Sequence, residues 1–172
     1  MINWDLIDSL LRKTRPDQNE PYRVAIYSRM PYADGQEAIA ATHIKFMKIA
    51  INRDTRFHLA EVHADYGIKS ADLMSMLEYR RIIERCKAGK IDLVMIHDIS
   101  RIAKDRFQLI KNLEPLSDCH PEIGLLSLAD CLLVMSGDAV DWAEKMASGN
   151  YTACRLPYYA GFIPQPPTHC ET

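Results

Sequence analysis

The chain has 172 residues, of which 48% are hydrophobic and 26% are charged, and its formal net charge at pH 7 is −2. These values are typical of one soluble globular domain with a sizeable core. A domain that binds duplex DNA normally carries a basic excess, because its affinity comes largely from neutralised phosphates. The missing excess predicts weak or no autonomous DNA binding.

Five cysteines are spread along the chain without a C-x-x-C pair. Disulfide frameworks and tetrahedral zinc sites need tighter spacing, so we expect free thiols in a reducing cytoplasm. Asp5 and Asp8 interrupt the apolar residues near the N-terminus, which argues against a signal sequence. No apolar run approaches the roughly 20 residues that span a bilayer. We therefore expect a cytoplasmic protein with no membrane partner.

Residues 1–21 predict an N-terminal helical appendage followed by a linker. The apolar residues between Asn3 and Thr14 recur at helical spacing, at Leu6, Ile7, Leu10 and Leu11. Residues 15–21 (RPDQNEP) are polar and contain two prolines, as linkers often do. We expect the apolar stripe to pack on the chain's own domain, because surface stripes normally find local cover. The alternative is a stripe that binds a partner protein.

From Tyr22 onward, strand patterns alternate with helix patterns. The predicted strands are Tyr22–Tyr27, Phe57–His63, Ile91–His97 and Ile123–Leu128, and the predicted helices are Gln36–Ile51, Leu77–Ala88, Asp105–Leu113 and Asp138–Ala147. Strands separated by helices need crossover connections and a mostly parallel sheet. The pattern therefore predicts an α/β domain over residues 22–150, with four to five strands and helices on both faces. The proline-rich residues 151–172 predict an irregular tail.

Basic residues follow two of the predicted strands, where function gathers in folds of this class. Arg29 follows the first strand, and Arg101 and Lys104 follow the third. Arginine suits phosphate because its planar group donates two parallel hydrogen bonds. These three residues therefore predict an anion site. The alternative is that they are ordinary solvated basic residues near helix starts.

The runs VAIYSRMP, HADYGIKS and RRIIERCKAGKIDLVMIHDISRIAKD resemble, in order and spacing, the serine site-specific recombinases of the resolvase and invertase family. The resemblance covers about Tyr22 to Val134, and its most specific part is KAGKIDLV followed by ISRIAKD. It implies the family's catalytic-domain fold. It also implies an activity in which a serine hydroxyl attacks a DNA phosphodiester and arginines stabilise the transition state.

Five residues occupy matching positions of the family pattern: Tyr27, Arg29, Asp65, Arg101 and Lys104. Lys104 replaces an arginine, so it keeps the charge and loses the bidentate geometry. Other positions depart further, since Lys69 stands where a serine belongs and Met76 where an arginine is expected. Most important, Pro31 occupies the position of the nucleophile.

Proline has neither a hydroxyl nor a backbone N–H, so Pro31 cannot attack a phosphate. Ser28 is no substitute, because side chains alternate along a strand and Ser28 faces away from Arg29. Ser70 and Ser100 lie on other loops. The resemblance thus implies a degenerate active site, and we expect no strand cleavage.

Three functional hypotheses remain open at this point. The first is an inactive recombinase-like module that acts through protein contacts, as a homodimer or bound to an active recombinase. The second is a divergent recombinase that uses a displaced serine. The third is a binder of phosphate or nucleotide in the crevice at the strand ends.

No cofactor is expected, and the histidines give no ligand spacing for a metal. His58 and His63, five residues apart on one strand, are expected to face opposite sides of the sheet. After Asp138–Ala147, we expect no helix-turn-helix or zinc-bearing DNA-binding module in the remaining residues.

Overall fold

We describe the chain from a computed structural model, which defines residues 2–16, 19–32, 34–138 and 159–160. Within these ranges the α-helices are α1 (Trp4–Thr14), α2 (Glu37–Ile51), α3 (Leu77–Lys87) and α4 (Arg106–Leu113). The short 3-10 helices are η1 (Ile99–Arg101) and η2 (Glu114–Leu116). The strands are β1 (Tyr22–Met30), β2 (Phe57–Tyr66), β3 (Leu93–Ile96), β4 (Gly124–Ser127), β5 (Leu132–Met135) and β6 (Tyr159–Ala160).

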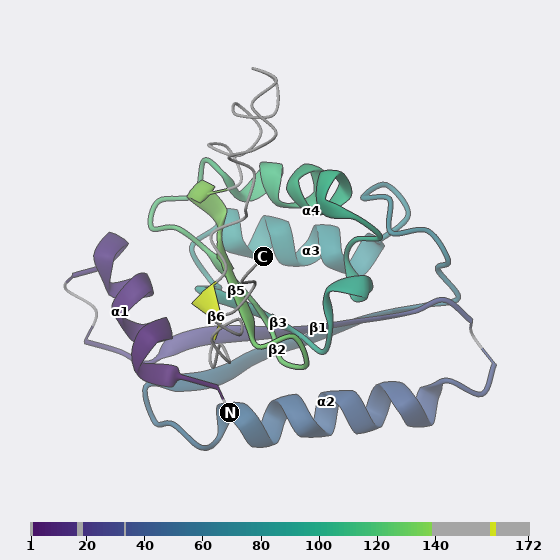
Figure 1. The fold of residues 1–172 in the computed structure, drawn as a ribbon, viewed down its shortest axis with the longest axis horizontal. Coiled ribbons are helices and arrows are strands. Elements are labelled where there is room, and N and C mark those ends of the chain that lie inside the picture. The colour runs from purple at the N-terminus through teal and green to yellow at the C-terminus, as the bar shows by residue number, and fades with distance from the viewer. Residues whose placement is uncertain (1, 17–18, 33, 139–158, 161–172) are drawn as a thin grey trace, which may run out of the picture.

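The strands form one six-stranded sheet in the order β2-β1-β3-β4-β5-β6. The first four are parallel, whereas β5 and β6 are antiparallel to their neighbours. Figure 1 shows α2 on one side of this sheet and α3 and α4 on the other. The predicted α/β class, the mostly parallel sheet and the helices on both faces are confirmed. The two antiparallel strands were not expected.

One core lies between the sheet and helices α1 and α2. Ile7, Leu10 and Leu11 of α1 are buried there beside residues of β1, β3, β4 and β5. Gly124 makes room for its sheet neighbours, since a Cβ atom there would lie 2.7 Å from Leu93 and 3.2 Å from Leu133. The apolar stripe of α1 therefore packs on the chain's own domain, as its spacing predicted.

A second core lies on the opposite face, beneath α3 and α4. Tyr79, Ile82 and Ile83 of α3 pack there against β1 residues Ala25 and Tyr27. Because side chains alternate along a strand, β1 sends Ala25, Tyr27 and Arg29 to this face and Val24, Ile26 and Ser28 to the α2 face. This alternation decides which β1 side chains meet at the candidate site.

Strands β1 and β2 each run three residues further than predicted, to Met30 and Tyr66. Their register also shifts at a bulge, so that Val24 pairs with Leu59 and Ala25 with Glu61. The extra residue places His58 opposite Arg23 and His63 opposite Tyr27, on one face of the sheet. The prediction that these two histidines face opposite sides was therefore wrong.

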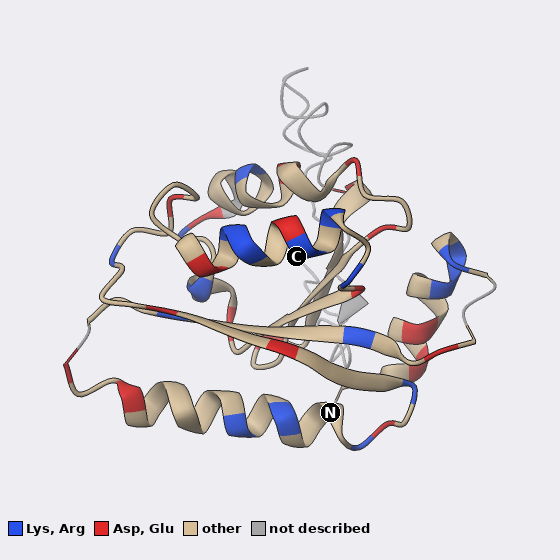
Figure 2. Cartoon of the chain, turned by 180° about the vertical axis from the view of Figure 1, so that it is seen from behind, with Lys and Arg blue, Asp and Glu red and all other residues tan. Residues whose placement is uncertain are grey.

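Two ion clusters fasten the ends of α1 to the sheet. Arg56, just before β2, bonds Asp54 and reaches Asp5 and Asp8 on α1. The second cluster surrounds Asp92 at the start of β3 and is described below. Basic and acidic residues are interspersed over the described elements (Figure 2).

Only the first residue of the predicted helix Asp138–Ala147 is described, and most of the tail 151–172 lies outside the described residues. Within the described ranges, no helix combines the length and the apolar character that a membrane crossing requires.

Candidate functional site

The matching residues of the family pattern meet at the carboxyl ends of β1, β2 and β3. Arg29 and Asp65 are register partners on β1 and β2, and both are buried, with 6% and 7% of their surfaces exposed. Arg101 follows β3 in η1, and its guanidinium donates to the backbone oxygen of Arg29 over 2.9 Å. The structure thus brings Tyr27, Arg29, Asp65 and Arg101 together at what we call the carboxyl edge.

Arg29 is bound almost entirely by the chain's own backbone. Its Nε donates to the backbone carbonyl of Arg101 at 2.8 Å, and its Nη2 donates to the backbone carbonyl of Ser100 at 2.6 Å. Its Nη1 donates to the carbonyls of Ile68 and Lys69 at 2.7 and 3.2 Å. Burial lowers the pKa of Arg29 from its ordinary value. In this geometry Arg29 ties the loop after β2 to the loop after β3.

Asp98 organises the loop after β3. Its carboxylate accepts hydrogen bonds from the Ser100 hydroxyl, from Arg101 Nε at 3.0 Å and from His97 Nδ1 at 2.9 Å. Burial alone would raise the pKa of Asp98, but these three bonds hold it at about 2. Asp98 is therefore ionised at neutral pH and fixes the direction of the Arg101 guanidinium.

Asp65 caps helix α3 from the neighbouring strand. The N-cap residue Met76 has no capping side chain, and Asp65 instead accepts the backbone N–H of Glu78 at 3.1 Å and of Tyr79 at 3.4 Å. The Tyr27 hydroxyl donates to the same carboxylate at 2.9 Å. Burial, followed by the charge of Asp65, raises the pKa of Tyr27. A carboxylate at a helix N-terminus stabilises the helix through both the hydrogen bonds and the dipole.

Pro31 lies directly after β1 and is half-buried. The exposed residues near it are Tyr32 and Lys69, whose ammonium lies 5.2 Å from the centre of the Tyr32 ring. Lys104 is also exposed, and its backbone N–H donates to Gln108. Of the basic residues named from the sequence near the carboxyl edge, Lys69 and Lys104 are thus the exposed ones.

Met76, at the position of an expected arginine, is fully buried in the core beneath α3. Ser28 is buried on the α2 face of β1, as predicted, and its hydroxyl has no hydrogen-bond partner among the described residues. Ser70 accepts the backbone N–H of Asp72. Ser100 is exposed, so it is the most accessible of the three serines considered as substitutes for Pro31.

A stacked pair of imidazoles lies beside this edge and was not predicted. The rings of His43 on α2 and His97 after β3 are parallel within 7°, with centroids 3.6 Å apart. Burial, followed by His97 and Arg101, lowers the pKa of His43. No cluster of metal-ligating side chains occurs among the described residues. The two histidines are 54 positions apart, so sequence spacing carries no signal of their contact.

A scan against protein-family models found no match, and a search of curated proteins also found none. Solved structures do match. The N-terminal catalytic domain of TP901-1 integrase aligns with a TM-score of 0.52 at 17% identity, over 75% of this chain and 99% of that one. A resolvase family site-specific recombinase from Streptococcus pneumoniae aligns with a TM-score of 0.50 at 18% identity, over 76% of this chain and 93% of that one.

A third match is the C-terminal catalytic domain of ISC1926 TnpA, an IS607-like serine recombinase, with a TM-score of 0.51 at 18% identity over 62% of this chain and 68% of that one. The chain has the fold of serine recombinase catalytic domains. The fold that the motifs implied is therefore confirmed. At these identities the likeness concerns the fold, and the chemistry of the chain has to be argued from its own residues.

Proposed function

We propose that this serine recombinase-like domain does not cleave DNA and instead acts through protein contacts, as a homodimer or bound to an active recombinase. The proposal rests on the carboxyl edge, where the resemblance to the family puts Pro31 at the position of the nucleophile. Without a hydroxyl at that position, the family's first covalent bond cannot form there.

The state of the retained residues supports the same proposal. The guanidinium of Arg29 donates hydrogen bonds to four backbone carbonyls, and the carboxylate of Asp65 caps α3. Both residues therefore have structural reasons to persist in a domain that has no chemistry to perform. Loss of a nucleophile alone can lower a rate by about 10⁶, on the evidence of serine proteases.

The proposal is tested by covalent trapping. The purified chain is incubated with supercoiled plasmid and with nicked suicide duplexes of recombination-site sequence, and the mixture is denatured and examined for protein–DNA adducts. We expect no adduct from the wild-type chain. An adduct, mapped by peptide mass spectrometry to any residue, overturns the proposal.

Restoration of activity needs a careful choice of variants. Pro31→Ser changes a half-buried residue after a strand, so it should leave the fold intact. Met76→Arg would instead place a guanidinium in the core beneath α3, at a cost of several kcal/mol. We therefore expect Pro31→Ser with Lys104→Arg to be the informative pair, and we expect it to remain inactive because Arg29 is held by carbonyls.

The protein-contact part of the proposal has its own measurement. The mass of the chain in solution, from light scattering at several concentrations, reports a homodimer directly. A chain that stays monomeric and also leaves the strand exchange of active recombinases unchanged would contradict this part, whatever the trapping result.

A displaced serine is the second candidate, and the geometry favours Ser100. Its hydroxyl is exposed, adjoins Arg101 and donates to Asp98. Against it stands the pKa of Asp98 at about 2, which makes this carboxylate a weak base. Trapping with the Ser100→Ala variant decides, because an adduct that disappears in this variant assigns the nucleophile.

Binding of phosphate or nucleotide by Arg29, Arg101 and Lys104 stays a prediction. In the observed conformation Arg29 would first have to release backbone carbonyls, whereas Lys104 is free of that constraint. Saturable binding of nucleotides, with a rise in melting temperature that Lys104→Ala abolishes, would favour this third function.

A further inference from the structure

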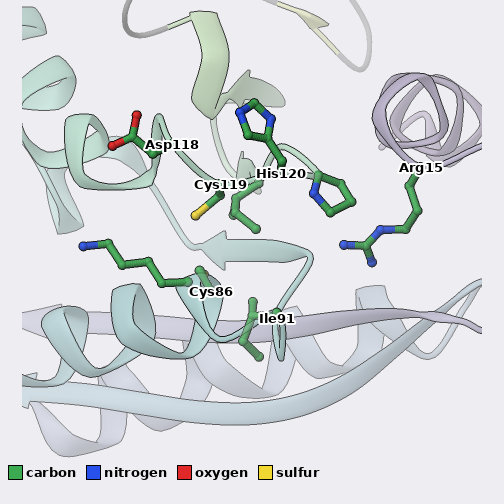
Figure 3. Close-up of a pocket in the computed structure, with 10 residues that line it drawn as sticks. Arg15, Cys86, Ile91, Asp118, Cys119 and His120 are labelled. Atoms are coloured by element: carbon green, nitrogen blue, oxygen red, sulfur yellow. The ribbon is translucent and has the colours of Figure 1, made fainter.

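A cavity of about 450 Å³ (Figure 3) is lined by Ile91 and Ile123, which precede β3 and β4, so it lies at the amino-terminal ends of these strands. Arg29 lies at the carboxyl end of β1. Three segments that are distant in sequence form the wall of the cavity: the end of α1, the end of α3 and the loop before β4. We call it the amino-edge cavity. Its side chains include Arg15, Lys87, Asp118, His120, Ile91 and Ile123.

Arg15 is fixed in the wall of this cavity. One of its nitrogens bonds Asp92, which is 1% exposed and also binds the guanidinium of Arg23 at 2.7 and 2.9 Å. The other guanidinium nitrogens of Arg15 donate to no residue that the structure describes, and Figure 3 shows the group turned toward the cavity. A guanidinium held on one side and open on the other is prepared to bind an anion without further ordering.

The charges around the cavity favour an anion over a cation. Asp92 faces two guanidiniums, of which Arg23 also feels the charge of Glu20. Lys87 and His120 are exposed at the rim, and Asp118 is the one carboxylate among the described residues that line it. Among the residues that line the cavity, the cationic side chains of Arg15 and Lys87 accompany one carboxylate, Asp118, while Asp92 behind Arg15 balances part of that positive charge.

The remaining lining is apolar. Ile91 and Ile123 are buried beside the cavity, and Pro121 adds an apolar ring next to His120. An inorganic ion would leave the apolar surface of Ile91, Ile123 and Pro121 in contact with water. An organic anion would cover this apolar surface, and the removal of that surface from water would favour binding.

We propose that the amino-edge cavity binds a small organic anion, a carboxylate or a phosphate monoester whose apolar body rests on Ile91 and Ile123. Arg15 holds the anionic group, and Lys87 adds positive charge to the rim. The site lies away from the carboxyl edge, so it depends on neither strand cleavage nor its absence.

The test is a titration of the full chain with phenyl phosphate, benzoate, inorganic phosphate and benzyl alcohol. The readouts are the melting temperature and the methyl NMR signals of Ile91 and Ile123, with Ile68 and Ile99 as reporters of the carboxyl edge. We expect phenyl phosphate or benzoate to saturate and to shift Ile91 and Ile123. Preference between these two probes identifies the anionic group, and benzyl alcohol should bind at least about 10-fold more weakly.

Matched variants locate the binding. Lys87→Glu reverses a charge at the rim and should weaken binding roughly 10-fold. Arg81→Glu makes the same change on the exposed face of the same helix, away from this cavity, and should leave binding unchanged. Arg15→Gln should abolish binding, with its NMR spectrum confirming that the chain is folded.

Three results overturn the proposal. The first is the absence of saturation by every anion at millimolar concentration. The second is an equal loss with Lys87→Glu and Arg81→Glu, which indicates nonspecific attraction. The third is a response of Ile68 and Ile99 in place of Ile91 and Ile123, which assigns the anion to the carboxyl edge.

Discussion

The two edges of the sheet use arginines in different ways. At the carboxyl edge, Arg29 is surrounded by neutral backbone carbonyls, and no carboxylate of the described residues is hydrogen-bonded to it. At the amino edge, Arg15 and Arg23 share the carboxylate of Asp92. At the carboxyl edge, the hydrogen-bond donors of Arg29 hold two loops in place. At the amino edge, part of the Arg15 guanidinium faces a cavity. Family resemblance points to the first edge, but the geometry makes the second the more available for a ligand.

Arg29→Ala should have the largest effect on stability. The substitution leaves backbone carbonyls of two loops without a hydrogen-bond donor, and we expect the free energy of unfolding to fall by about 3–5 kcal/mol. Arg29→Lys should recover only a small part, because an ammonium cannot reach all four oxygens. Urea unfolding measures both, with the exposed Lys104→Ala as the control. A loss under about 1 kcal/mol would show that Arg29 does not hold the loops.

Asp92→Asn should have the next largest effect. It leaves two guanidiniums facing a neutral amide, yet both are partly exposed and can be hydrated. We therefore expect a loss of about 2–3 kcal/mol in urea unfolding, below the value for a fully buried pair. The exposed Asp118→Asn serves as the matched control at the same edge. Equal losses for the two variants would contradict the role given to Asp92.

Asp65→Asn should cost about 1–2 kcal/mol, because an amide oxygen still accepts one helix N–H but lacks the charge that favours the helix dipole. Amide hydrogen exchange locates the effect, and faster exchange is expected for Glu78 and Tyr79 at the start of α3. Unchanged exchange there, with stability still lost, would mean that Asp65 acts through Tyr27 and not as a cap.

The smallest effect is the pH dependence from His43. Its pKa is lowered in the folded chain, so the unfolded chain binds more protons and stability falls as the pH drops below about 6.5. The loss levels off below the folded pKa, and we expect it to stay under about 1 kcal/mol. His43→Phe keeps a stacked ring and should flatten the curve between pH 7.5 and 5, measured by urea unfolding. A curve that keeps its slope would assign it to other groups.

Sequence patterns were enough for the alternation of strands and helices, because the helix faces and the apolar strand Leu93–Ile96 carry strong local signals. Strand β5 escaped prediction because it is four residues long and follows a tight turn at Cys131, whose φ is +49°. The bulge in β2 between Leu59 and Glu61 also escaped, since no residue type in the strand marks the place where the alternation of faces shifts by one residue.

At the site, the motifs located Arg29, Asp65 and Arg101 correctly at one edge. Their partners could not be predicted, because Arg29 binds backbone atoms 39 to 72 positions away and any residue type supplies a carbonyl. The stacked pair of His43 with His97 joins residues that are 54 positions apart, so its contact could not be predicted either. The partners of Asp98 are local, at His97, Ser100 and Arg101, but their bonds depend on how the loop after β3 turns. The sequence shows which polar side chains are present at the site. Which atoms they bind depends on the conformation of the loops, which the sequence pattern does not predict.

Whether the donors of Arg29 are occupied by the chain's own backbone is measured by side-chain NMR of ¹⁵N-labelled protein. The Nε–H signals of Arg29 and Arg101 are followed during a titration with phenyl phosphate. We expect the Arg29 proton to exchange slowly with water and its signal not to move, even where Arg101 responds. Fast exchange, or a saturable shift of the Arg29 signal, would contradict this expectation and return Arg29 to the role of an anion ligand.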